Sequence, residues 1–191
     1  MKPLLIIMIK EPRPGRVKTR LGRDIGTIPA TWWFRHQSAR LMRRLRDPRW
    51  QIELAVAPDL AVSSRVWPAD LPRRAQGGGD LGQRMGAMLR ARPQGPTCLI
   101  GADIPGITRP HIARAFKALG AHDAVFGPAV DGGYWLVGAR HPKRLPRSLF
   151  QNVRWSSEHT LADSLRSLPD YRIALTDPLR DVDTGADLPV S

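Results

Sequence analysis

The stretch LLIIMIKEPRPGRVKTRLG, residues 4–22, joins a continuous apolar run to a basic loop. The apolar run, Leu4–Ile9, is rich in β-branched side chains, which is typical of a strand buried on both faces of a sheet. The loop after it contains four residues suited to phosphate binding: Gly15, Arg16, Lys18 and Arg20. Glycine permits close backbone approach, and guanidinium and ammonium groups bind phosphate oxygens. A solvated basic turn explains the same residues, so both interpretations stay open.

Outward from this stretch, strand patterns alternate with helix patterns. Further strands are expected at Ile52–Ala57, Thr97–Gly101, Ala124–Phe126, Tyr134–Val137 and Arg172–Leu175. Strands separated by helical segments, without an internal repeat or a linker, indicate an α/β layer fold with a mostly parallel sheet.

The expected helices are recognised by their apolar faces and capping residues. An amphipathic helix over 30–46 places Phe34, Leu41, Met42 and Leu45 on its buried side. Asp80, with Gln83 at the capping-box position, begins a helix that presents Leu81, Met85 and Met88 to the core. Three further capped segments are predicted: a helix from Thr108 to Gly120, a helix that starts at Ser156 with Leu161, Leu165 and Leu168 inward, and a turn at Thr184 and Asp187.

The chain of 191 residues has an ordinary globular composition, with 42% hydrophobic and 25% charged residues. This length suits one domain with a real core, so we expect a single domain over residues 1–191. No apolar run approaches the roughly 20 residues that cross a bilayer, and Leu4–Ile9 is too short for a signal-peptide core. The single cysteine, Cys98, fits a reducing compartment and an inert place in a buried strand. We expect a cytoplasmic protein without a membrane span.

The formal net charge is +13, from 30 Lys and Arg against 17 Asp and Glu. This charge fits a nucleic-acid partner, an anionic membrane surface or anionic substrates. The arginines are scattered over many segments, and no zinc-finger or RNP-type motif accompanies them. We therefore expect a solvated basic surface and no specific nucleic acid as partner.

Carboxylates follow strands at positions suited to a metal site. Asp103 comes directly after the expected strand Thr97–Gly101, and Asp181 and Asp183 lie near the C-terminus. Magnesium takes one or two protein carboxylates and completes its octahedron with water and phosphate oxygens. Capping of turns and helices is the alternative role for these aspartates. Because ligands bind at the carboxyl ends of strands in such sheets, Asp103 and the basic loop are expected to meet in one crevice.

Two further segments contain residues that suit the binding of a second substrate. Asp131, Gly132 and Gly133 form a turn whose carboxylate can bind hydroxyls or act as a base. Trp155 and Ser156 can supply a stacking surface and a polar contact. A hairpin turn, a buried tryptophan and a helix cap explain the same residues without function. No G-x-S-x-G nucleophile motif occurs in the sequence.

Six motifs, in this order and spacing, resemble a bacterial family of small glycosyltransferase-like proteins: PRPGRVKTRLG, QGGGDLGQRM, IGADIPGI, FGPAVDGGYWLVG, LFQNVRWSS and DVDTGADL. The family was long a domain of unknown function, and its members are often described as arsenosugar-biosynthesis glycosyltransferases. It is similar to the nucleotide-diphospho-sugar transferase superfamily, which includes molybdenum-cofactor and phospholactate guanylyltransferases and sugar-acid cytidylyltransferases. The resemblance covers residues 4–188 and implies a Rossmann-like, GT-A type three-layer sandwich. One segment departs from the family pattern: TWWFRHQSAR, residues 31–40, is unusually aromatic and basic.

The resemblance also implies roles for individual residues. Asp103 and Asp183 would hold Mg²⁺ or Mn²⁺, and Lys18, Asp103 and Asp131 would be catalytic, with Lys18 and Asp103 on opposite sides of one diphosphate. The nucleotide side would comprise Gly15, Arg16, Lys18, Arg20, Gly79, Asp80 and Arg84. The acceptor side would comprise Asp131, Gly132, Gly133, Tyr134, Trp155 and Ser156.

Three functions are compatible with these residues. The first is a metal-dependent glycosyltransferase that uses a nucleotide sugar and a small-molecule acceptor, and the closest resemblance favours it. The second is a nucleotidyltransferase acting on a small phosphorylated substrate, because the same cations would stabilise charge on its phosphate oxygens. The third is a nucleotide- or nucleic-acid-binding protein without catalysis, which would have no need of a pair of metal-binding aspartates.

Overall fold

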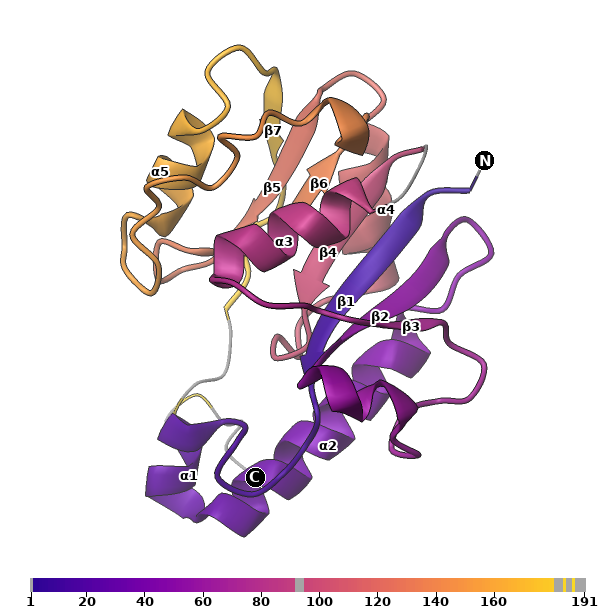
Figure 1. Cartoon of the computed structure of the whole chain (residues 1–191), viewed down its shortest axis with the longest axis vertical. Helices are drawn as coiled ribbons and strands as arrows, with labels where there is room; N and C mark the ends of the chain where they lie inside the picture. The colour runs from indigo at the N-terminus through magenta and orange to yellow at the C-terminus, as the bar shows by residue number, and fades with distance from the viewer. Residues whose placement is uncertain (1, 92–94, 181–183, 185–186, 188–191) are drawn as a thin grey trace.

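The computed structural model describes residues 2–91, 95–180, 184 and 187. Within these residues the strands are β1 (Leu4–Lys10), β2 (Gln51–Ala57), β3 (Arg73–Ala75), β4 (Thr97–Gly101), β5 (Ala124–Pro128), β6 (Tyr134–Ala139) and β7 (Ile173–Leu175). The α-helices are α1 (Thr19–Ile25), α2 (Thr27–Arg44), α3 (Leu81–Arg90), α4 (Arg109–Ala118) and α5 (Thr160–Arg166), and short 3₁₀ turns occupy Asp59–Ser63 and Pro142–Arg144. Figure 1 shows their arrangement.

The strands described form one seven-stranded sheet in the order β3-β2-β1-β4-β6-β5-β7. Neighbouring strands of the sheet pair in parallel, except that β6 is antiparallel to both of its neighbours, β4 and β5. The carboxyl ends of β1, β4 and β5 therefore meet at the same edge. After β1 the chain crosses first to β2 on one side and later to β4 on the other. A loop that follows β1 and a loop that follows β4 consequently flank a switch point in strand order, where such sheets bind ligands.

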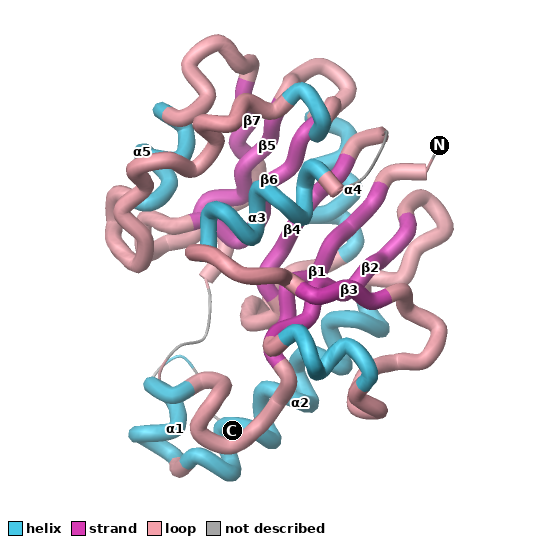
Figure 2. Tube along the Cα trace, viewed as in Figure 1, coloured by secondary structure: helices cyan, strands magenta, loops and turns pink. Residues whose placement is uncertain are grey.

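The core consists of two apolar layers, one on each face of the sheet. Alternate residues of β1 supply both layers, because successive side chains of a strand point to opposite faces. Leu5 and Ile7 pack with apolar side chains of α2 and α4. Leu4 and Ile6 pack with those of α3 and α5. Figure 2 shows the helices on both sides of the sheet. The structure is therefore the three-layer, mostly parallel α/β sandwich that the sequence predicted.

The strand predictions are confirmed, and the helix predictions need four corrections. Ser156 does not begin a helix: its φ of 57° is left-handed, and α5 starts at Thr160. Leu81 was expected in the core, but it is exposed and lines a cleft, because it is the first residue of α3. The 30–46 helix is α2, beginning at Thr27, and the short α1 before it was not predicted.

The caps predicted at Asp80 and at Thr184 are formed. Asp80 accepts a hydrogen bond from the Gln83 backbone at 2.8 Å, and the Gln83 side chain accepts from the Asp80 N–H at 2.9 Å. Asp187 accepts from the backbone and the hydroxyl of Thr184, as predicted for the last turn.

Cys98 is buried in β4, and burial raises the pKa of its thiol. In the described part of the chain, no helix combines the length and apolar character needed to cross a membrane.

Candidate functional site

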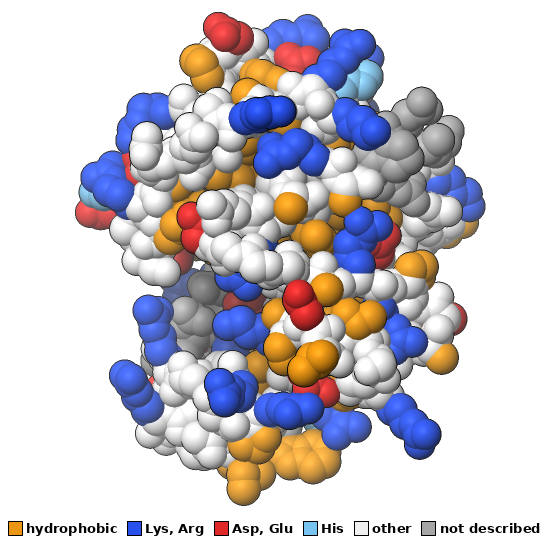
Figure 3. Space-filling model, viewed as in Figure 1, with side chains coloured by type: hydrophobic (Ala, Val, Ile, Leu, Met, Phe, Trp, Pro, Cys, Tyr) orange, Lys and Arg blue, Asp and Glu red, His pale blue; other side chains and the backbone are white. Residues whose placement is uncertain are grey.

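A cleft of about 600 Å³ opens at the edge of the sheet where β1, β4 and β5 end. Figure 3 shows the surface hollowed between the part that carries α1 and α2 and the part that carries α3 and α5. The cleft is lined by these residues from the sequence prediction: Arg16, Lys18, Arg20, Arg84, Asp103, Asp131, Gly133, Tyr134, Trp155 and Ser156. Four others do not line it: Gly15, Gly79, Asp80 and Gly132. The predicted metal ligand Asp183, like Asp181, lies outside the described residues.

Lys18 is held in an unusual conformation at the start of α1. Its φ of 45° and ψ of 50° are left-handed, a conformation that costs a non-glycine residue about 1–2 kcal/mol. Residues in sparsely populated backbone conformations concentrate at ligand sites, so this one supports a role for Lys18. The side chain is only 6% exposed, and its Nζ lies 3.3 Å from Oδ2 of Asp103. The loop after β1 and the loop after β4 thus place two of the predicted side chains in direct contact.

Asp103 presents a carboxylate at the mouth of the cleft. Its side chain is 44% exposed, while its neighbours Ala102 and Ile104 are buried and fix the backbone. A Cβ on Gly101 would lie 2.7 Å from Oδ1 of Asp103, so the glycine leaves room for the carboxylate to fold back over β4. An accessible carboxylate fixed in this way is suited to bind a hard cation, whose preferred ligands are oxygens.

A buried glutamine that the sequence reasoning missed orients Arg84. The Nε2 of Gln76 donates to the carbonyl of Ala55 at 2.8 Å and to that of Ile9 at 3.4 Å. These two acceptors fix the amide, so its Oε1 faces the cleft and accepts from Nη1 of Arg84 at 3.2 Å. The only signal in the sequence was a polar residue at the start of QGGGDLGQRM, after a strand too short for periodicity to reveal.

Gly79 and Asp80 organise the start of α3 and do not face the cleft. Gly79 has a φ of 93°, and a Cβ there would lie 2.3 Å from Oε1 of Gln83. Glycine is therefore needed where Gln83 reaches back to the Asp80 backbone. The Asp80 carboxylate is occupied as the helix cap. These two residues position α3, which carries Arg84 into the cleft.

The turn between β5 and β6 packs closely against the loop before α5. Gly132 has a φ of 85°, and a Cβ there would lie 2.4 Å from the carbonyl oxygen of Glu158. The backbone of Gly132 also accepts a hydrogen bond from Leu161 at 3.0 Å. Asp131 stays exposed in this turn, and its Oδ1 accepts from the Gly133 N–H at 2.9 Å. The two segments assigned to the acceptor side are therefore adjacent.

Trp155 lines the cleft, and the loop that carries it packs closely against α3. A Cβ on Gly82 would lie 2.8 Å from Trp155 and 2.7 Å from Cβ of Phe150. The rings of Phe150 and Trp155 meet edge to face at 5.9 Å, and the rings of Phe150 and Tyr134 stack at 6.4 Å. These aromatic contacts fix the apolar wall of the cleft.

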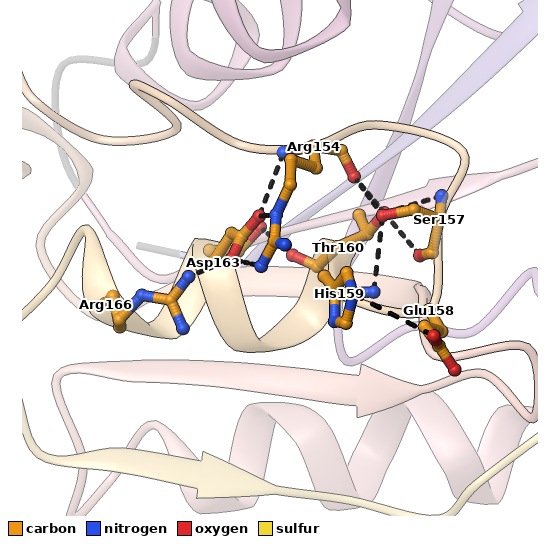
Figure 4. A network of polar contacts seen from close by, with 8 residues as sticks. Arg154, Ser157, Glu158, His159, Thr160, Asp163 and Arg166 are labelled. Atoms are coloured by element: carbon orange, nitrogen blue, oxygen red, sulfur yellow. Dashed lines mark hydrogen bonds and ion pairs between the residues drawn. The ribbon is translucent and has the colours of Figure 1, made fainter.

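The loop from Arg154 to Thr160 is anchored by the buried carboxylate of Asp163, which the sequence did not reveal (Figure 4). Asp163 accepts from the backbone N–H of Arg154 at 3.0 Å and from its guanidinium at 2.8 and 2.9 Å. Arg166 also donates to this carboxylate. At the other end of the loop, the hydroxyls of Ser157 and Thr160 donate to the Arg154 carbonyl at 2.7 and 2.8 Å. Trp155 and Ser156 are held between these anchors.

We expect Asp163→Asn to loosen this loop and to lower the Tm of the protein at neutral pH. The side-chain hydrogen bonds of Arg154, followed by its backbone N–H, hold the pKa of Asp163 below its ordinary value. Because the pKa of Asp163 is lower in the folded than in the unfolded protein, its carboxylate contributes its full stabilisation above the unfolded pKa of about 3.9. That stabilisation is lost as the pH falls toward and through the folded-state pKa.

Thermal melts of wild type and Asp163→Asn across pH 3 to 8, with Asp170→Asn as an exposed control on the next turn, test this expectation. The difference in Tm between wild type and Asp163→Asn should be constant from pH 8 to about 5. It should shrink below about pH 4, where the wild-type carboxylate becomes protonated. A difference that persists unchanged at acid pH would show that the charge of Asp163 is not the anchor.

The fold of this chain is that of the nucleotide-diphospho-sugar transferases. The profile of the bacterial family described as "Uncharacterized protein conserved in bacteria (DUF2064)" matches residues 40–157, and the chain belongs to this family. The family resemblance drawn from the motifs is thereby confirmed. None of the curated proteins compared with the chain matches it.

Solved structures share the fold. A provisionally named nucleotide-diphospho-sugar transferase from Desulfovibrio desulfuricans G20 is 29% identical with a TM-score of 0.88, over 96% of this chain and 84% of that one. A CMP:2-keto-3-deoxy-manno-octonic acid synthetase solved with CTP is 11% identical with a TM-score of 0.55, over 97% and 95% of the chains. A Mycobacterium tuberculosis H37Rv protein solved with manganese is 14% identical with a TM-score of 0.56, over 98% and 96%.

Proposed function

We propose that the protein is a divalent-metal-dependent glycosyltransferase that uses a nucleotide-sugar donor and a small-molecule acceptor. The observation that carries the proposal is the contact between Lys18 and Asp103 in a cleft to which Arg16, Arg20 and Arg84 also contribute. Several cations beside an accessible carboxylate suit a diphosphate that is bound together with a metal ion. The names of the Desulfovibrio protein and of the CTP-bound synthetase support a transferase that binds a nucleotide.

A divalent cation fits the residues present. Among the described residues no group of three or more His, Cys, Asp or Glu side chains gathers as a metal site. Magnesium and manganese sites in nucleotide-dependent enzymes need fewer protein ligands, because phosphate oxygens and water complete the coordination. Asp103 would supply one carboxylate, and Asp183 is proposed as the second. When bound, the cation would supply positive charge to the leaving diphosphate.

The acceptor half of the cleft favours glycosyl over nucleotidyl transfer. The β5–β6 turn and the loop before α5 contribute Asp131, Tyr134 and Trp155, together with Ser156, Ser157 and Thr160. Among the described residues, these two segments contribute no Lys or Arg side chain to the lining of the cleft. Arg154, which lies in the second segment, is bonded to Asp163 instead. In the nucleotidyltransferase alternative the phosphorylated substrate attacks through a negatively charged phosphate, which cations would bind. Hydroxyls, aromatic rings and one carboxylate suit a neutral, hydroxyl-bearing acceptor.

In the proposed reaction an acceptor hydroxyl attacks the anomeric carbon of the sugar. The bond from that carbon to the diphosphate oxygen breaks, and its electron pair leaves with the nucleoside diphosphate. Lys18, Arg16 and Arg20 stabilise the negative charge that develops on the leaving group. Asp131, exposed at the turn, is proposed to accept the proton of the hydroxyl.

Nucleotidyl transfer is the second candidate, and the CTP complex of a protein with the same fold favours it. In this reaction a substrate phosphate attacks the α-phosphate of a nucleoside triphosphate and expels pyrophosphate. The two functions release different products, which separates them. Incubation with nucleotide sugars and Mn²⁺ should release nucleoside diphosphate, whereas pyrophosphate release from a nucleoside triphosphate with a phosphorylated substrate would favour the second.

We expect a nucleoside diphosphate to stabilise the protein only in the presence of Mg²⁺ or Mn²⁺. At a ligand concentration of about 100 Kd the stabilisation is about 2.7 kcal/mol, which corresponds to a rise in Tm of roughly 5–10 °C for a chain of this size. Thermal melts with each nucleoside diphosphate, with cation and with chelator, measure it. Equal shifts in the two conditions would remove the metal from the proposal.

A further inference from the structure

An apolar patch lies at the corner where α1 meets α2, away from the cleft. We define it by Ile25, Ile28 and Trp32; Ile28 is 61% exposed and Trp32 is 54% exposed. Gly26, with a φ of 93°, makes the corner between the helices, and Ile28 and Trp32 are one helical turn apart on the same face of α2. Figure 3 shows hydrophobic side chains at the lower end of the molecule, where Figure 1 places α1 and the start of α2.

Basic side chains continue along the exposed side of these helices. They are Arg23 on α1 and Arg35, Arg40 and Arg43 on α2, and Asp24 is the one acidic residue between 19 and 44. The structure gives none of these four arginines a carboxylate partner among the described residues, although Arg35 lies 5.6 Å from the Trp32 ring. Some exposed arginines elsewhere are paired, for example Arg114 with Asp177 and Arg172 with Asp123.

We propose that this corner docks on an anionic phospholipid surface. Partition into the boundary between headgroups and acyl chains needs a small apolar wedge with cations beside it. The two isoleucines and the tryptophan supply the wedge, and tryptophan is favoured at this depth of a bilayer. The four arginines supply attraction to anionic headgroups. Nucleic acid fits less well, because two of the three patch side chains, Ile25 and Ile28, are branched aliphatic and offer no surface on which bases stack.

Vesicle flotation with the full chain tests the proposal. One set of vesicles is pure phosphatidylcholine and the other contains about 30 mol% phosphatidylglycerol, at about 50 mM salt so that electrostatic attraction is weakly screened. We expect at least about tenfold tighter binding to the anionic vesicles. Raising the salt to about 300 mM should weaken the binding, because it screens the arginines.

Paired variants separate the wedge from the charges. Ile28→Ser with Trp32→Ser should reduce binding to anionic vesicles at least about fivefold, because the wedge is lost. Arg35→Gln with Arg43→Gln should remove most of the preference for anionic lipid. The matched control is Leu60→Ser with Arg65→Gln, an exposed apolar and basic pair beside β2 that should bind vesicles like wild type. The altered side chains are exposed, so circular dichroism should show that all variants fold.

Three results would overturn the proposal. The first is wild-type protein that does not float with anionic vesicles, or that binds them no better than neutral ones. The second is a concentration-dependent dimer that Trp32→Ser dissociates, which would make the patch an interface between two copies of the chain. The third is tight binding of DNA or RNA at physiological salt that depends on Trp32, which would identify a nucleic-acid surface.

Discussion

Asp103→Asn should abolish turnover and leave the protein folded. The substitution keeps the shape of the side chain but removes the charge that is proposed to hold the metal ion. Stabilisation of a transferring group by a metal ion contributes several kcal/mol, so turnover should fall at least about 10³-fold. The fold should persist, because the side chain is 44% exposed at the open end of β4. Steady-state kinetics across a Mn²⁺ titration, together with a thermal melt, measure both effects.

Asp177→Asn is the matched control for this substitution. Asp177 is also partly exposed and paired with an arginine, Arg114 at 2.8 Å, but it does not line the cleft. Its substitution should leave turnover and cation dependence as in wild type. If Asp103→Asn unfolds the protein while Asp177→Asn does not, Asp103 is a structural residue. If Asp103→Asn binds nucleotide with undiminished cation dependence, the metal is bound elsewhere.

Lys18→Met should weaken nucleotide affinity about 10- to 150-fold. A hydrogen bond from a charged donor contributes roughly 1.5–3 kcal/mol, and each 1.4 kcal/mol changes affinity tenfold. Methionine retains the apolar part of the buried side chain, so the loss reports the ammonium group. Titration calorimetry with a nucleoside diphosphate and Mg²⁺ measures it. Lys117→Met, on the exposed face of α4, is the control and should bind like wild type.

The contact between Lys18 and Asp103 makes these two predictions interdependent. The double variant, Lys18→Met with Asp103→Asn, should lose less nucleotide binding free energy than the sum of the losses in the two single variants. Side chains in contact act as a unit, so their effects do not add. Additive losses of nucleotide affinity would instead place the two residues at independent positions on the ligand. Unchanged affinity in Lys18→Met would remove Lys18 from the phosphate site.

The sequence by itself determined the elements whose cause is local. The apolar run Leu4–Ile9 is buried as a strand, because a continuous apolar run excludes a solvent-facing side. Asp80 with Gln83, and Thr184 with Asp187, form the predicted caps, since each cap needs only residues three apart. The strands before the basic loop and before Asp103, β1 and β4, could be predicted for the same reason. Their parallel pairing then brings their carboxyl ends to one edge of the sheet.

Only the tertiary structure decided which side chains meet at that edge. Lys18 contacts Asp103 through pairing of β1 with β4, and Gln76 orients Arg84 through carbonyls on two other strands. Asp163 anchors the loop that begins at Arg154, where a helix had been predicted from Ser156. No sequence period encodes these contacts, because each depends on strand register or on a loop conformation fixed by residues distant in the chain. The sequence therefore indicated where a site would form, and packing decided which residues form it.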